Sequence, residues 1–102
     1  MDKITFDFND KTAVITGGAQ GFGLDIAKRF LKSGAKVIIW DTDSEMLKKV
    51  IKEVNNKNLT SKIVDVSNYE QVSNCINEII KNSNIDILIN NAGITGPTAT
   101  LW

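Results

Sequence analysis

Four short apolar segments, separated by longer stretches of mixed polarity, predict four β-strands. They are rich in valine and isoleucine, which favour strands, and they comprise residues 11–16, 36–40, 61–65 and 85–89. Two of them contain uninterrupted apolar runs, AVI and VII, which are typical of strands covered on both faces. The pattern therefore predicts a sheet buried between two layers.

Three segments between these strands have apolar residues at helical spacing. The apolar face of the first comprises Phe22, Ile26, Ala27, Phe30 and Leu31. The second comprises Met46, Leu47, Val50, Ile51 and Val54, and the third Val72, Cys75, Ile76, Ile79 and Ile80. Because Cys75 lies on such a face, we predict that it is a small core residue.

The ends of these helices carry local signals. Gly34, directly after a serine, is a typical residue to end the first helix. Thr42 with Glu45, and Ser67 with Glu70, have the spacing of a capping box. We therefore expect the second helix to open at Thr42 and the third at Ser67.

Strands and helices alternate along the whole chain, from the first strand to the fourth. Such alternation predicts an α/β domain with a doubly wound parallel sheet and right-handed crossovers, formed by residues 1–102 as a single unit. In open parallel sheets, ligands bind outside the carboxyl ends of the strands. The residues just after each strand are therefore the candidates for chemistry.

Composition excludes several other functions. The 102 residues carry twelve basic and twelve acidic side chains, so no net charge favours nucleic acid or an anionic membrane. No apolar run approaches the roughly 18 residues of a membrane span, and the opening MDKITFDFND has acids where a signal peptide is apolar, so we expect a cytoplasmic protein. With one cysteine and no histidine, neither an intrachain disulfide nor a zinc site is expected, and histidine cannot act as acid or base.

A glycine-rich segment, TGGAQGFG, comes after the first strand. Gly17 would permit a tight turn, Gly21 would let backbone N–H groups approach a pyrophosphate, and Gly23 would bring the next helix close to the sheet. The alternative is that the glycines serve packing alone, in a turn without a ligand.

Asp41 comes directly after the second strand. A carboxylate there can accept hydrogen bonds from both hydroxyls of an adenine ribose and would repel a 2′-phosphate. Its neighbours Gln20 and Thr42 are not basic, so we predict NAD rather than NADP. The alternative is that Asp41 only helps the next helix to begin. Trp40 precedes it on the strand, so its side chain should point to the opposite face of the sheet.

Polar residues also stand after the third and fourth strands. Asp65 and then Val66 come after the third, and Asn90 and Asn91 come after the fourth. Taken singly, each could be an ordinary turn residue. Together, in order and each at a strand end, they favour one shared site.

With these motifs the chain resembles the N-terminal half of the short-chain dehydrogenase/reductase family, over residues 6–102. TGGAQGFG matches the family's TGxxxGxG loop, with Phe22 where Ile or Leu is usual, and NNAG at residues 90–93 matches a second family motif. The segment GITGPTATLW is similar to the residues after NNAG in 3-oxoacyl-carrier-protein reductases and in NAD-linked sugar and alcohol dehydrogenases. The resemblance implies a Rossmann-type sheet, here ending after its fourth strand.

The resemblance also implies which residues contact the cofactor. They are Gly17, Gln20, Gly21, Phe22 and Gly23 in the loop, then Asp41, Asp65 and Val66, and finally Asn90, Ala92 and Gly93. The loop would bind the pyrophosphate, Asp41 the adenine ribose, and the pair at 65–66 the adenine ring. Residues 90–93 would contact the adenosine side and steady the central sheet.

The family's catalytic groups are a serine and a Tyr-x-x-x-Lys pair, both downstream of the part that this chain resembles. The single tyrosine, Tyr69, has Ser73 four residues later instead of a lysine, so we assign no catalytic residue and expect this chain alone to be inactive. The implied whole protein is an NAD-dependent oxidoreductase of a small-molecule substrate that assembles as a homo-oligomer. The alternatives are a nucleotide-binding module without chemistry and a fold that binds a partner.

We also expect the outer edge of the fourth strand to be unpaired, which favours instability or association.

Overall fold

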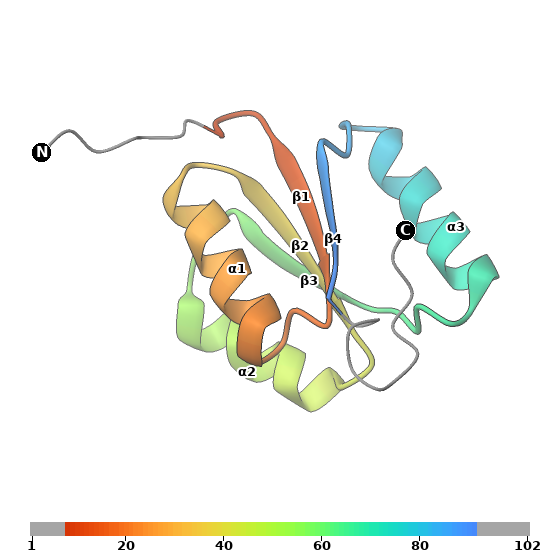
Figure 1. Ribbon diagram of the computed structural model, residues 1–102, viewed down its shortest axis with the longest axis horizontal. Coiled ribbons are helices and arrows are strands. Elements are labelled where there is room, and N and C mark those ends of the chain that lie inside the picture. The colour runs from red at the N-terminus through yellow and green to blue at the C-terminus, as the bar shows by residue number, and fades with distance from the viewer. Residues whose placement is uncertain (1–7, 92–102) are drawn as a thin grey trace, which may run out of the picture.

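The computed structural model describes residues 8–91, which form one parallel sheet with helices between its strands (Figure 1). The elements are β1 (Thr12–Thr16), α1 (Gly21–Lys32), β2 (Lys36–Asp41), α2 (Ser44–Val54), β3 (Leu59–Ile63), α3 (Tyr69–Ile80) and β4 (Ile87–Asn90). The strand order is β3-β2-β1-β4, and each pair of neighbours is parallel. The doubly wound α/β fold predicted from the sequence is confirmed.

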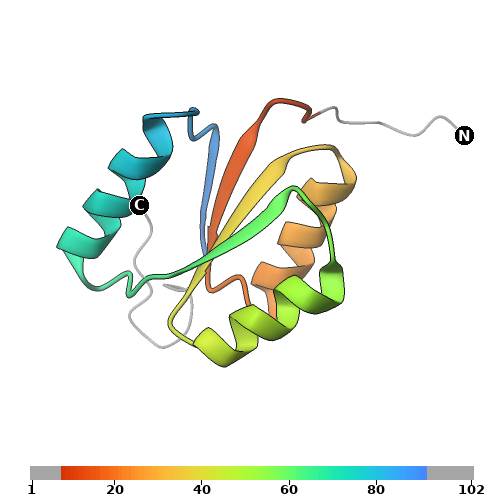
Figure 2. The same cartoon turned by 180° about the vertical axis from the view of Figure 1, so that it is seen from behind.

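The sheet separates two apolar cores. α1 and α2 cover one face and α3 covers the other, as the two opposite views show (Figures 1 and 2). Ile15 and Ile39 lie in the core under α1 and α2, whereas Val14, Trp40 and Cys75 lie in the core under α3. Because β1 is buried on both faces, burying each large apolar side chain there contributes about 1.5–3 kcal/mol relative to its exposure.

The strand order reverses next to β1. The chain runs outward from β1 to β2 and β3, then crosses through α3 to β4 on the other side of β1. Such a reversal leaves a crevice at the carboxyl ends of the strands, because the flanking connections depart to opposite faces. Within the described part of the chain, β4 pairs with β1 alone, so its outer edge is unpaired as expected.

The third strand begins earlier than the apolar pattern suggests. β3 spans Leu59–Ile63 instead of residues 61–65, because Leu59 is buried and pairs with Val37 of β2. Val64 donates its backbone N–H to the carbonyl of Asp41 and then leaves the ladder. β4 likewise begins later than expected, because the Asp86 carboxylate accepts a hydrogen bond from the backbone N–H of Thr12 at 2.9 Å.

The helix starts are displaced from the predicted capping boxes. The residue that caps α2 is Asp43, not Thr42, and its carboxylate accepts from the backbone N–H of Met46 at 3.1 Å. The residue that caps α3 is Asn68, not Ser67. The reason is a preceding turn in each case. Asp41, the last residue of β2, and Asp65, two residues after β3, each accept a hydrogen bond from the backbone N–H two residues on, which delays the cap by one position. The glycine stop of α1 is confirmed, since Gly34 has a φ of 95°.

The cap assignment for α3 predicts a difference between two neighbouring substitutions. Asn68→Ala should lower the free energy of unfolding by about 1 kcal/mol, because the backbone N–H of Gln71 loses its acceptor at 3.1 Å. Ser67→Ala, at the position favoured by the capping-box pattern, removes only an exposed bond to Asp65 and leaves the cap of α3 in place, so it should cost less. Urea titration of both variants measures the two losses, and equal losses would contradict the assignment.

A cofactor-sized site at the carboxyl ends of the strands

The glycine-rich loop forms a tight turn between β1 and α1. Gly17 and Gly21 have φ angles of 63° and 59°, in the left-handed region that glycine adopts without strain. The backbone N–H groups of Gly17 and Gly18 both point to the carbonyl of Trp40, at 2.7 and 3.4 Å. The loop is therefore anchored to the end of β2.

Two glycines allow close packing. A Cβ at Gly23 would overlap the carbonyl oxygen of Gly17 and lie 2.9 Å from Nδ2 of Asn91, so only glycine lets α1 approach the loop. A Cβ at Gly18 would lie 2.5 Å from Cγ2 of Ile39. Gly18 was not among the predicted site residues. Its one signal in the sequence is that it directly follows Gly17. Close packing, the alternative explanation for the glycines of this loop, therefore accounts for Gly18 and Gly23.

The N-terminus of α1 differs from those of the other two helices. Gln20, at its N-cap position, makes no side-chain capping bond, and the first turn carries no acidic residue. α2 and α3 both have a capping side chain and a glutamate in the first turn. A Cβ at Gly21 would meet nothing within 4 Å, and both Gln20 and Phe22 are exposed beside it. The open N–H groups and the helix dipole favour an anion at this end of α1.

Asp41 links the loop to the start of α2. Its Oδ2 accepts a hydrogen bond from the N–H of Ala19 at 3.3 Å, and its Oδ1 accepts from the N–H of Asp43 at 3.1 Å. The alternative role for Asp41, in the start of the next helix, is therefore real, although the cap itself is Asp43. A carboxylate accepts about four hydrogen bonds, so both oxygens retain capacity for hydroxyl donors.

Four predicted site residues meet in one pocket. Gly17, Asp41, Asp65 and Val66 come from the ends of β1, β2 and β3 and line a hollow of about 200 Å³. The other lining residues are Trp40, Thr42 and Val64, so among residues 8–91 no basic side chain lines this hollow.

The two asparagines at the end of β4 hold the centre of the site together. The Thr16 hydroxyl donates to Oδ1 of Asn90 at 3.1 Å, which joins β1 to β4. Nδ2 of Asn91 donates to the carbonyl of Gly17 at 3.1 Å, which joins β4 to the glycine loop. Their expected role in steadying the central sheet is thus visible, whereas Ala92 and Gly93 lie outside the described residues.

A sequence model described as short chain dehydrogenase matches residues 11–101. The chain belongs to the short-chain dehydrogenase family. Among its curated relatives are 3-oxoacyl-acyl-carrier-protein reductases of Chlamydia pneumoniae and Rickettsia prowazekii. The first is 41% identical over 83% of this chain and 36% of the relative, and the second 40% identical over 93% and 38%. Secoisolariciresinol dehydrogenase of Forsythia intermedia is 39% identical over 85% of this chain and 32% of the relative.

Solved structures include chains of similar fold, and one of them is described as a member of the same family. The crystal structure of gox2181 superposes with a TM-score of 0.73 at 31% identity, covering 80% of this chain and 33% of that one. A short-chain dehydrogenase from Novosphingobium aromaticivorans superposes with a TM-score of 0.76 at 26% identity, covering 80% and 31%. The chain thus spans about a third of the length of the proteins it matches.

Two further residues of this short-chain dehydrogenase chain bear on chemistry. Tyr69 opens α3 and is 85% exposed, which agrees with a surface tyrosine rather than a catalytic one. Oδ1 of Asp65 accepts from the Ser67 hydroxyl at 2.6 Å and from the Ser67 N–H at 3.0 Å. These two bonds, of which the hydroxyl bond has the larger effect, hold the pKa of Asp65 below its usual range.

No helix in residues 8–91 is both long and apolar enough to cross a membrane.

The lowered pKa of Asp65 predicts a dependence on pH. The ionised form is favoured by folding, so this stabilisation is present above the ordinary pKa of an aspartate and is lost as pH falls through the lowered one. Ser67→Ala should raise the pKa of Asp65 by removing the larger cause, whereas Ser67→Thr keeps the hydroxyl and should not. Carboxyl carbon shifts in an NMR titration measure both, and identical titration curves would contradict the assignment.

Proposed function

We propose that this chain forms the cofactor-binding part of an NAD-dependent oxidoreductase. The observation that carries the proposal is the convergence of Gly17, Asp41, Asp65 and Val66 on one pocket, beside the uncapped N-terminus of α1. When bound, the nicotinamide would supply the hydride donor or acceptor. The residues of this chain bind and orient the nucleotide.

The donors and acceptors of the site fit a dinucleotide. The open N–H groups at the start of α1 suit the pyrophosphate, and Gly21 leaves free space above them. The Asp41 carboxylate, held from both sides by backbone N–H groups, suits the two hydroxyls of the adenine ribose. Asp65 and Val66 would then border the adenine ring in the same hollow.

The charge of the pocket supports NAD over NADP. A 2′-phosphate would lie against the Asp41 carboxylate, and none of the described residues that line the hollow is a lysine or an arginine to offset the repulsion. We therefore propose that NADH binds more tightly than NADPH.

For the substrate we propose a small carbonyl compound or alcohol, with 3-oxoacyl thioesters first. The support is the similarity to 3-oxoacyl-acyl-carrier-protein reductases, at 40–41% identity for the two relatives described above. Sugar and alcohol substrates are the other members of this class. Assays for these substrates need a protein of the relatives' full length, because this chain covers little more than a third of those relatives.

Thermal unfolding with and without cofactor tests the proposal. NADH at a hundred times its dissociation constant should add about 2.7 kcal/mol of stability. For a domain of this size each kcal/mol corresponds to about 4–8 °C, so Tm should rise by roughly 10–20 °C, and by much less with NADPH.

Each alternative predicts a different result. A cooperative transition that NADH leaves unmoved would contradict cofactor binding and favour a fold that binds a partner. Equal shifts with NADH and NADPH would contradict the role given to Asp41. A longer protein that binds NADH but lacks a downstream Tyr-x-x-x-Lys would instead be a nucleotide-binding module without chemistry.

A further inference from the structure

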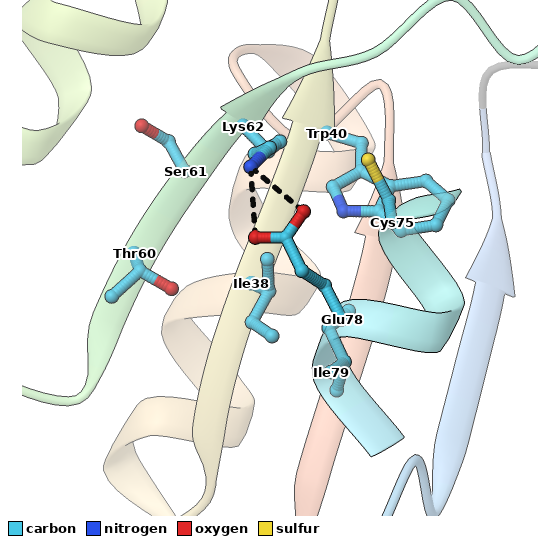
Figure 3. Close-up of a pocket in the computed structure, with 8 residues that line it drawn as sticks. All are labelled: Ile38, Trp40, Thr60, Ser61, Lys62, Cys75, Glu78 and Ile79. Atoms are coloured by element: carbon cyan, nitrogen blue, oxygen red, sulfur yellow. Dashed lines mark hydrogen bonds and ion pairs between the residues drawn. The ribbon is translucent and has the colours of Figure 1, made fainter. Parts of the chain in front are cut away.

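A second pocket lies on the other side of the sheet from α1 and α2, under α3 (Figure 3). We call it the α3 pocket, and its volume is about 160 Å³. β2 and β3 contribute Ile38, Trp40 and Thr60 to its wall, and α3 contributes Cys75, Glu78 and Ile79.

The register of the sheet explains why this space exists. Thr60 pairs with Ile38, and Lys62 pairs with Trp40, so the four side chains share the face that α3 covers. In the described sheet β3 is an edge strand, and opposite Ile38 it presents the short side chain of Thr60. The larger Ile38 and Trp40 of β2 therefore face a space that the side chain of Thr60 does not fill.

The indole N–H of Trp40 is the decisive feature of the pocket. The side chain is 2% exposed, and Nε1 has no hydrogen-bond partner among the residues that the structure describes. Figure 3 shows this nitrogen at the edge of the ring that faces Glu78 and Ile38. A buried donor without an acceptor is rare and costly, so an acceptor atom placed in the pocket would be bound favourably.

The remaining wall determines what kind of molecule fits. Lys62 Nζ lies 3.3 Å from Glu78 Oε1 at the rim, so the two charges offset each other and neither attracts an ion strongly. Ile38, Ile79 and Cys75 supply an apolar wall. The polar side of the wall comes from Thr60, Ser61, Lys62 and Glu78. The volume of about 160 Å³ is close to that of cavities that hold a molecule the size of benzene.

We propose that the α3 pocket binds a small neutral organic molecule with one hydrogen-bond acceptor. The acceptor oxygen would take the indole N–H of Trp40, and the apolar body would pack on Ile38 and Ile79. This pocket shares only Trp40 with the lining of the proposed nucleotide site. The proposal does not depend on oxidoreductase activity.

The test is an NMR titration of the indole proton of Trp40 in the full chain. The variant Trp102→Phe removes the other indole signal, so the remaining one belongs to Trp40. Cyclopentanone serves as the probe, and cyclopentane is its matched control without an acceptor. The ketone should shift the indole proton downfield with saturation in the millimolar range, and should bind about tenfold more tightly than the hydrocarbon.

A matched pair of variants locates the binding. Thr60→Phe adds a ring at an exposed strand position and should weaken ketone binding about tenfold or more, because the ring occupies the pocket. Thr60→Val has a similar strand propensity without the bulk and should bind as the parent does. The same spectra show whether each variant is folded.

Three results would overturn the proposal. The first is an indole proton that the ketone does not shift with saturation. The second is an equal shift by the hydrocarbon, which would leave no role for the acceptor. The third is an indole proton whose chemical shift changes in the Glu78→Ala variant but does not change when the ketone is added. That result would make Glu78 the hydrogen-bond partner of Trp40.

Discussion

Gly23→Ala is expected to lower the free energy of unfolding by about 3 kcal/mol and Tm by roughly 12–24 °C. The added Cβ would overlap the carbonyl oxygen of Gly17 and lie 2.9 Å from Asn91 Nδ2. The first of these is backbone and cannot rotate away, so α1 must move off the sheet and loosen the core beneath it. Thermal unfolding of the free protein measures the loss.

The sign of this effect separates tertiary packing from helix propensity. Within a helix alone, alanine is about 1 kcal/mol more favourable than glycine, so an isolated α1 would gain from the change. The matched control is Asp25→Ala, an exposed position on the same helix, where stability should change by less than about 0.5 kcal/mol. A Gly23→Ala variant as stable as the parent would mean that α1 does not approach the loop as described.

Asp41→Asn is expected to weaken NADH binding by about 100-fold. The carboxylate accepts from two ribose hydroxyls in the proposed complex, and hydrogen bonds to a charged group are worth about 1.5–3 kcal/mol each, roughly twice those to a neutral amide. At an NADH concentration that adds about 2.7 kcal/mol to the parent, the variant should gain only about 0.4 kcal/mol. The preference for NADH over NADPH should also shrink, because the repulsion of the 2′-phosphate is removed.

Asp43→Asn is the matched control for this effect. It removes the same charge two residues away, keeps an oxygen for the Met46 N–H, and lies outside the residues that line the pocket. Its NADH shift should equal that of the parent. If both variants lost the same affinity, the cause would be the local charge or the turn, not a specific contact of Asp41 with the ribose.

The element order and fold class could be predicted from periodicity, because each strand and helix has its own pattern of apolar residues. The glycine loop, Asp41 and the asparagines at the end of β4 could be chosen as candidates for a related reason. Parallel strands place their carboxyl ends at one edge of the sheet, so polar residues after several strands lie close together.

Local turn chemistry was harder to predict from sequence. A capping box describes four residues, whereas the starts of α2 and α3 depend on the turns formed by Asp41 and Asp65 just before them. The start of β3 depended on its pairing with β2, where Leu59 lies opposite Val37. Apolar alternation does not reveal which partner a residue meets.

Contacts between distant segments needed the folded chain. Gly18 matters because Ile39 of β2 lies above it, and Asn91 matters because its amide reaches the carbonyl of Gly17. Nothing near either residue in the sequence specifies that neighbour. Trp40 is a partly similar case. The face of the sheet on which its side chain lies could be inferred from strand alternation, but the surroundings of its indole N–H could not. Its indole N–H lacks an acceptor among residues 8–91 because of what β3 and α3 place around it. Sequence patterns report periodicity within a segment, and a pocket forms where the side chains of several segments fail to fill the space between them.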